Sequence, residues 1–187
     1  MAAILSLWLP ILLSAVAVFI ISSIIHMFLG YHNTDFKKLP NEEGVMDDLR
    51  KHNIPPGDYV MPHASTGKER NTPEFKDKMN KGPVAFITMF PSGQMGMGSS
   101  LILWFIYCII VGVFAAYITG RAWGPEASYM NVFKFAAVTS FAGYGLALLQ
   151  GSIWFKKSWS ATFKSLFDAL IYALITAGFF GWLWPAA

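Results

Sequence analysis

The sequence predicts an all-α membrane protein with four transmembrane helices and a hydrophilic loop of about 65 residues between the first two helices. Four long apolar runs carry the prediction, and the run from Ala2 to Gly30 contains no Asp, Glu, Lys or Arg. Each run has about 20 or more residues, enough for a helix to cross a hydrocarbon core of about 30 Å. The composition agrees, because 55% of the residues are hydrophobic and only 13% are charged, unlike the average soluble protein.

In chain order, we expect the first transmembrane helix over residues 1–30 and the loop module over 31–98. The other transmembrane helices are expected over 99–120, 132–154 and 162–184. Pro10 suits the first turn of the first helix, since proline is tolerated there. Ala15-Val16-Ala17 is similar to a cleavage site, but the apolar run continues past it, so we expect this helix to be retained as an anchor.

The loop module carries signals for short helices. Val45, Met46 and Leu49 recur at helical spacing ahead of a Pro-Pro-Gly breaker. Thr72-Pro73-Glu74 combines a capping residue, a proline at the first helical position and an early acid, which predicts a second helix to about Lys81. The apolar run 84–90 is too short to span a membrane, and we expect it to be extended or interfacial; a re-entrant segment is the alternative.

The distribution of positive charge predicts the orientation of the chain. The side that holds the loop 31–98 also holds Lys156, Lys157 and Lys164, and together they carry 12 of the 14 Lys and Arg residues. Cytoplasmic loops carry an excess of such residues. We therefore expect a multi-pass protein of the bacterial inner membrane with a cytoplasmic loop and both chain ends outside.

Charge and cysteine content exclude several functions. Within the loop, nine Lys and Arg balance nine Asp and Glu, so the concentrated basic face that nucleic-acid binding requires is not present. Cys108 is the only cysteine, which excludes internal disulfides and cysteine metal frameworks. No metal site is predicted, because the spacing of the loop histidines and nearby methionines fits no ligand pattern; these are His32, His52, His63, Met61, Met95 and Met97.

One layer of polar side chains lies within the predicted spans. Asp168, His26 and Gln150 come from three different helices and share a similar depth near the cytoplasmic side. An ionisable residue inside a span must be paired or lie near water. Either these residues bond to one another, or to Lys164, and hold the helices together, or they form a site that handles protons or binds a ligand.

The sequence predicts no bound cofactor. His26 is the one intramembrane histidine and the one candidate axial ligand for a haem or a chlorin magnesium. A haem held by two histidines would need a second one inside the membrane. No catalytic residues are predicted either, because neither a nucleophile elbow nor a phosphate-cradling glycine loop is present.

Small residues recur every fourth position in three spans. Such stripes allow helix backbones to approach closely in a bilayer, and they predict packing within a bundle or against other subunits. The helix-packing residues expected from this pattern are Gly112, Ala116, Gly143, Ala147, Ala169, Ala173 and Ala177.

Several sequence segments resemble those of a family of small four-span bacterial membrane proteins of unknown function. They are residues 22–27 at the end of the first span, 39–43 and 83–93 in the loop, and 167–174 with 181–185 in the last span. The resemblance covers most of the chain. It implies a bacterial inner-membrane origin but supplies no activity, substrate or binding residue.

From these observations we expect a non-catalytic accessory subunit of a larger membrane complex. Its expected partners are other membrane-protein subunits and lipid. An energy-converting complex, respiratory or photosynthetic, is the context we expect. The alternative is a small proton-coupled transporter or channel that uses Asp168 and His26. A membrane enzyme that acts on lipid through its loop histidines is a third, weaker hypothesis.

Overall fold

The computed structural model describes residues 4–93 and 96–185, and it is mostly helical. Residues 1–3 of the predicted first span and 94–95 of the predicted loop lie outside the described residues. The chain divides into two units, one formed by 4–37 with 96–185 and the other by 38–93. Each is described by itself.

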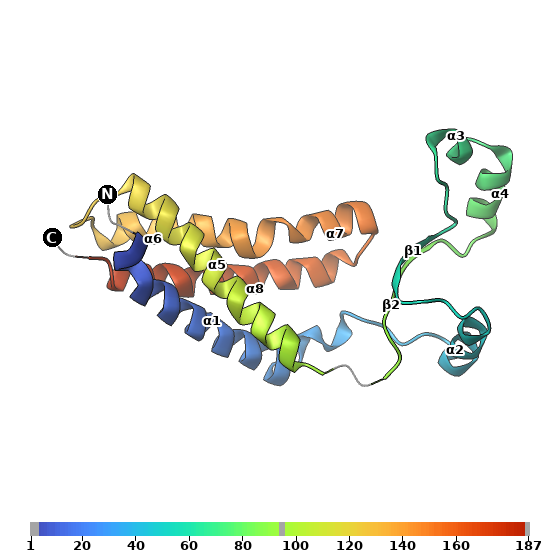
Figure 1. Ribbon diagram of the computed structural model, residues 1–187, viewed down its shortest axis with the longest axis horizontal. Coiled ribbons are helices and arrows are strands. Elements are labelled where there is room, and N and C mark those ends of the chain that lie inside the picture. The colour runs from blue at the N-terminus through green and yellow to red at the C-terminus, as the bar shows by residue number, and fades with distance from the viewer. Residues whose placement is uncertain (1–3, 94–95, 186–187) are drawn as a thin grey trace. The chain divides into compact units, whose positions relative to one another are not determined.

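The larger unit contains four helices that are long and apolar enough to cross a membrane, Leu5–Phe28, Gly98–Ala122, Tyr129–Phe155 and Trp159–Trp182. The four predicted spans are therefore confirmed by length and composition. The first comprises a 3₁₀ turn, η1 (Ile4–Leu7), and α1 (Trp8–Phe28). The second is α5 (Gly98–Ala122) and the fourth is α8 (Trp159–Trp182), as Figure 1 shows.

The third span is not one regular helix. It comprises α6 (Tyr129–Phe141), a π-helical turn, η3 (Ala142–Leu146), and α7 (Leu148–Phe155). A π turn disturbs the regular hydrogen bonding of a helix. The Tyr107 hydroxyl of α5 donates a hydrogen bond to the Gly143 carbonyl oxygen within this turn. At Gly145, an added Cβ would lie 3.0 Å from the Cβ of Ala169, so glycine permits the close approach of this turn to α8.

The helices pack through small residues. An added Cβ at Gly112 of α5 would lie 3.2 Å from the Ile11 side chain of α1, so α5 and α1 approach closely there. Gly112 and Ala116 are buried, whereas Gly143 and Ala147 of the third-span stripe are exposed. The stripe of α8 is buried as well and comprises Ala169, Ala173 and Ala177.

The core of this unit forms two clusters. The cluster nearer the chain ends consists of apolar residues, each at most 7% exposed. It comprises Leu7, Ile11, Ala115, Ala116, Val132, Ala136, Ala177 and Phe180. The other cluster extends toward the loop end of the bundle and includes Cys108, Tyr144 and Tyr172.

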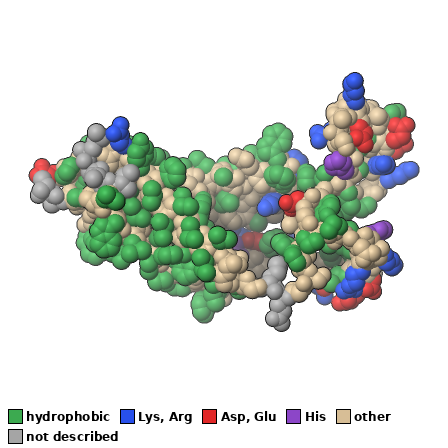
Figure 2. Space-filling model, in the orientation of Figure 1, with side chains coloured by type: hydrophobic (Ala, Val, Ile, Leu, Met, Phe, Trp, Pro, Cys, Tyr) green, Lys and Arg blue, Asp and Glu red, His purple; other side chains and the backbone are tan. Residues whose placement is uncertain are grey.

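The described part of the smaller unit contains three short helices and one pair of antiparallel strands. The helices are α2 (Glu42–Lys51), α3 (Gly67–Arg70) and α4 (Pro73–Lys81). Strands β1 (Gly57–Met61) and β2 (Ala85–Met89) pair antiparallel with Gly57 opposite Met89. Charged side chains gather on this unit, whereas hydrophobic ones cover the visible face of the four-helix unit (Figure 2).

The prediction of an all-α fold with one hydrophilic loop over 31–98 is thus wrong in its finer part. The first span ends at Phe28 and the second begins at Gly98. Residues 31–37 belong to the four-helix unit, and 38–93 contain the three short helices and the strand pair. The run 84–90 is extended, as expected, because β2 finds a hydrogen-bonded partner in β1. Helix α4 begins at Pro73, and the Thr72 hydroxyl accepts a hydrogen bond from the Phe75 backbone N–H.

Candidate functional site

The candidate site forms where the chain turns back after the first span. Gly30 adopts a left-handed conformation with φ of 65°, which glycine reaches without steric penalty. The next residues form a 3₁₀ turn, η2 (Tyr31–Thr34), that contacts α8. This turn brings residues 31–35 against Lys164 and Asp168, more than a hundred positions later in the chain.

Asp168 is 2% exposed, and both of its carboxylate oxygens have partners. The Tyr31 hydroxyl donates a hydrogen bond to Oδ1. Oδ2 lies 2.7 Å from Nε2 of His32. The buried carboxylate is therefore bonded by the segment that follows α1, rather than by a residue within the other spans.

His32 lies between two carboxylates, because its Nδ1 is 2.6 Å from Oδ2 of Asp35. Each of these two contacts needs a proton, since a carboxylate oxygen and a bare imidazole nitrogen both only accept. The Lys164 ammonium lies 2.8 Å from Asp35 Oδ1 and favours the ionised form of Asp35. Two arrangements then remain: His32 is an imidazolium between two carboxylates, or His32 is neutral and Asp168 is protonated. With the Lys164 ammonium included, both arrangements give the four groups a net charge of zero. The site thus holds one proton that His32 and Asp168 share.

Lys164 completes the cluster from the first turns of α8. Its Nζ donates to the Tyr31 carbonyl oxygen at 2.7 Å, to Thr34 Oγ1 at 2.8 Å and to Asp35 Oδ1 at 2.8 Å. These bonds use all three ammonium protons. The hydrogen bonds from Lys164 and then from His32 lower the pKa of Asp35 below its ordinary value. Lys164 therefore pairs with Asp35. One hypothesis from the sequence had Lys164 bonded to Asp168 instead.

His26, on the last turns of α1, stacks on His32 with ring centroids 4.6 Å apart and the planes within 6°. Its Nδ1 lies 3.0 Å from the Ser22 carbonyl oxygen. A carbonyl oxygen only accepts, so we assign the proton of neutral His26 to Nδ1. Nε2 then carries a free lone pair.

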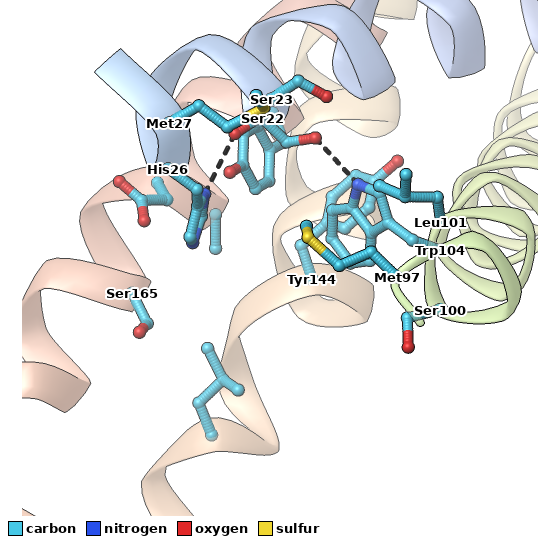
Figure 3. Close-up of a pocket in the computed structure, with 14 residues that line it drawn as sticks. Ser22, Ser23, His26, Met27, Met97, Ser100, Leu101, Trp104, Tyr144 and Ser165 are labelled. Atoms are coloured by element: carbon cyan, nitrogen blue, oxygen red, sulfur yellow. Dashed lines mark hydrogen bonds between the residues drawn. The ribbon is translucent and has the colours of Figure 1, made fainter. Parts of the chain in front are cut away.

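A pocket of about 400 Å³ lies beside this cluster, within the four-helix unit. Figure 3 shows His26 and Ser22 of α1 on one side, Leu101 and Trp104 of α5 on the other, and Tyr144 of the π turn between them. The Trp104 indole N–H donates to the Ser22 hydroxyl at 2.8 Å, which fixes this wall. Asp168 and Tyr172 of α8 also line the pocket.

Three ligand atoms, one each from His26, His32 and Asp168, lie within 4.8 Å of one another. Histidines that bind metals usually donate their second ring N–H to a carbonyl or a carboxylate, as His26 and His32 do here. However, Nε2 of His32 and Oδ2 of Asp168 already share a proton at 2.7 Å. A metal ion would have to displace that proton and separate the two groups. For a haem or chlorin, Nε2 of His26 is the one histidine nitrogen of this cluster with a free lone pair.

The structure places the other predicted site residue differently. Gln150 lies on α7 with an exposed side chain that neither lines the pocket nor makes a hydrogen bond to another described residue. Sequence reasoning missed Tyr31, His32 and Asp35, which were assigned to the loop. Gly30, a glycine at the end of a span, is a signal for the reversal of the chain there, although it does not identify the partners of Asp168.

Four buried polar atoms in the described part of the chain have no hydrogen-bond partner. They are Thr119 Oγ1, Trp123 Nε1, Ser140 Oγ and the Tyr172 hydroxyl. Such groups are rare, because an unpaired buried polar group is unfavourable. Among them, only Tyr172 lines the pocket.

Neither a family model, nor a curated protein, nor a solved structure matches this chain. Function is therefore inferred from the geometry of the site.

Proposed function

We propose that this chain is a non-catalytic accessory subunit of a larger membrane complex, with respiratory and photosynthetic complexes as the first to test. The observation that carries the proposal is Gln150. Its amide is exposed on the surface of the third span and makes no hydrogen bond to other described residues. A polar side chain facing lipid is stabilised when a neighbouring helix offers it a hydrogen bond. A partner helix that docks on α7 satisfies this amide.

The polar cluster supports a role in holding the chain together. Both oxygens of Asp168, both nitrogens of His32 and all protons of Lys164 have partners. The groups balance in charge and connect residues 31–35 to α8. A buried polar cluster of this kind, fully satisfied, specifies and rigidifies a structure. It needs no substrate to complete it.

Extraction of native membranes in mild detergent, followed by native gel electrophoresis and mass spectrometry, tests the subunit proposal. We expect the chain to migrate in a fixed assembly, and Gln150→Leu to release part of it. Phe163→Leu is the matched control, because Phe163 is 61% exposed on a different span, α8. Migration of the parent chain by itself, or equal release by both variants, contradicts the proposal.

We also propose that the chain lies in the bacterial inner membrane with residues 38–93 in the cytoplasm and both chain ends outside. The excess of Lys and Arg on the loop side supports this orientation. The alternating direction of four spans then brings both ends to the other side.

A proton-coupled transporter or channel is the second candidate, and one observation favours it: Asp168 and His26 line the same pocket. The apolar cluster toward the chain ends counts against it, because its members are at most 7% exposed. Of the polar side chains buried on the same helices, Thr119 and Ser140 have no hydrogen-bond partner among the described residues that would continue a route. Proteoliposome flux decides between the two. If the chain transports protons, Asp168→Asn abolishes flux, because an amide cannot release a proton; if it is a subunit, the parent protein shows no flux.

A further inference from the structure

The pocket beside His26 has the dimensions of a small-molecule site. Its volume of about 400 Å³ falls within the range of roughly 300–1,000 Å³ typical of ligand pockets. Most of its wall is apolar or aromatic and includes Leu101, Trp104, Tyr144 and Leu148. Binding sites in helix bundles have this character, with a few polar groups that orient the ligand.

Tyr172 is the polar group that lacks a partner. Its side chain is 4% exposed, it lines the pocket, and its hydroxyl makes no hydrogen bond to any described residue. A buried hydroxyl left in this way is unfavourable. A molecule in the pocket that accepts a hydrogen bond from Tyr172 removes the penalty. Because the hydroxyl oxygen itself is fully buried, the ligand reaches it only when the pocket wall moves slightly.

His26 supplies the complementary group. Because its Nδ1–H donates to the Ser22 carbonyl oxygen, Nε2 is an acceptor. His26 also lines the pocket (Figure 3). The site therefore offers a ligand one hydroxyl donor and one imidazole acceptor.

The charges of the site exclude ionic ligands. No Lys or Arg is among the described residues that line the pocket, and Lys164 is fully engaged by Tyr31, Thr34 and Asp35. A phosphate or carboxylate would find no cation there. Asp168 is bonded by Tyr31 and His32 within a cluster of zero net charge, so it does not attract a cationic ligand strongly.

We propose that this pocket binds an uncharged, lipid-soluble phenol of the quinol type. One phenolic oxygen accepts a hydrogen bond from the Tyr172 hydroxyl, and a phenolic O–H donates to Nε2 of His26. The flat ring lies among Trp104, Tyr144 and Tyr172. The corresponding quinone satisfies Tyr172 but offers His26 no proton, so the site prefers the reduced form.

The test uses the full chain in detergent micelles with three probes: a short-chain benzoquinol, its benzoquinone and the dimethyl ether of the quinol. We expect saturable binding of the quinol, and binding of the quinone and the ether weaker by about fivefold or more, since each lacks the donor for His26. Equal affinity for all three probes, or no saturable binding of the quinol, overturns the proposal.

Variants then locate the site. Tyr172→Phe removes only the hydroxyl and is expected to weaken quinol binding by about 5–10-fold, the loss of one hydrogen bond. Tyr117→Phe is the matched control, because Tyr117 is 50% exposed on α5 and does not line the pocket. His26→Phe keeps an aromatic ring but removes the acceptor, and is expected to abolish the preference for quinol over quinone. Unchanged binding in Tyr172→Phe, or an unchanged preference in His26→Phe, contradicts the assignment.

Thermal unfolding without ligand checks that the variants fold. Tyr172→Phe is expected to be as stable as the parent or more stable, because it deletes an unpartnered hydroxyl. A clear loss of stability would mean that an internal water already satisfies the hydroxyl, which overturns its role as a ligand donor. Displacement of the quinol by phosphatidylglycerol vesicles, with the same dependence on Tyr172, would overturn the choice of an uncharged ligand.

Discussion

At the residue scale, the function of Asp168 follows from how its two oxygens are used. A carboxylate inside a span is costly unless it is paired, and here Tyr31 and His32 each bond one oxygen. The shared proton lets the pair stay neutral together with Asp35 and Lys164. Asp168 thus stabilises the bundle without carrying an isolated buried charge.

We predict that Asp168→Asn is tolerated and Asp168→Ala is not. An Asn side chain can accept from Tyr31 with its oxygen and donate to Nε2 of neutral His32 with its amide, so the loss of stability should stay below about 1 kcal/mol. Alanine leaves both partners unpaired, and we expect a loss of about 2–4 kcal/mol. Unfolding in detergent measures both. Equal losses would show that the charge of Asp168, and not its hydrogen bonds, stabilises the fold.

A second prediction concerns pH and Asp35. The hydrogen bonds from Lys164 and His32 hold the pKa of Asp35 below its unfolded value of 3.8. A lowered folded pKa contributes stability that is fully present above the unfolded pKa and is lost as pH falls through the folded pKa. We therefore expect the parent chain to lose more stability than Asp35→Asn as the pH falls from 5 to 2. Parallel melting curves for the two proteins over this range would contradict the prediction.

At the element scale, glycine decides how closely the third and fourth spans approach. The π turn Ala142–Leu146 packs against α8, and Gly145 has the Cβ of Ala169 and the Leu166 side chain as neighbours. A methyl group at Gly145 would lie 3.0 Å from the Ala169 Cβ. Both positions lie on helix backbones, so the contact can be relieved only by moving the helices apart.

We predict that Gly145→Ala lowers stability by about 1–3 kcal/mol, the usual effect of overpacking a close contact. Gly178→Ala is the control, because an added Cβ at Gly178 of α8 meets nothing within 4 Å. There the better helix propensity of alanine should leave stability unchanged or raise it by up to about 1 kcal/mol. Thermal unfolding of both variants in one detergent gives the comparison. A stable Gly145→Ala variant would mean that the π turn can shift away from α8.

At the scale of the whole molecule, orientation in the membrane can be tested by labelling single introduced cysteines. Cys108 is the only cysteine and is buried, so it gives little background to a membrane-impermeant maleimide. We predict that Ser65→Cys, in the smaller unit, is labelled in inverted vesicles and protected in spheroplasts. Ser128→Cys, which precedes α6 on the opposite side, should behave in the reverse way. Both serines are exposed. Labelling of Ser65→Cys in intact spheroplasts would reverse the proposed orientation.

Some of the site was predictable from the sequence and some was not. Asp168 and His26 stand out as ionisable residues in apolar runs, and both line the pocket. Gln150 shares their depth but lies on an exposed face of α7. The depth of a residue in the membrane does not determine which side of its helix it lies on, and the π turn that precedes α7 changes the helical spacing. The pairing of β1 with β2 was missed, since each strand is only five residues long and two helices separate the strands in the chain.

By itself, the sequence determined four apolar helices of membrane length, because hydrophobicity and length are local properties that need no knowledge of neighbours. Only the tertiary structure decided what Asp168 contacts. Its partners Tyr31 and His32 are 137 and 136 positions away and are delivered by a reversal at Gly30. Contacts over such separations depend on how helices pack and turn in three dimensions, and no local pattern in the chain encodes them.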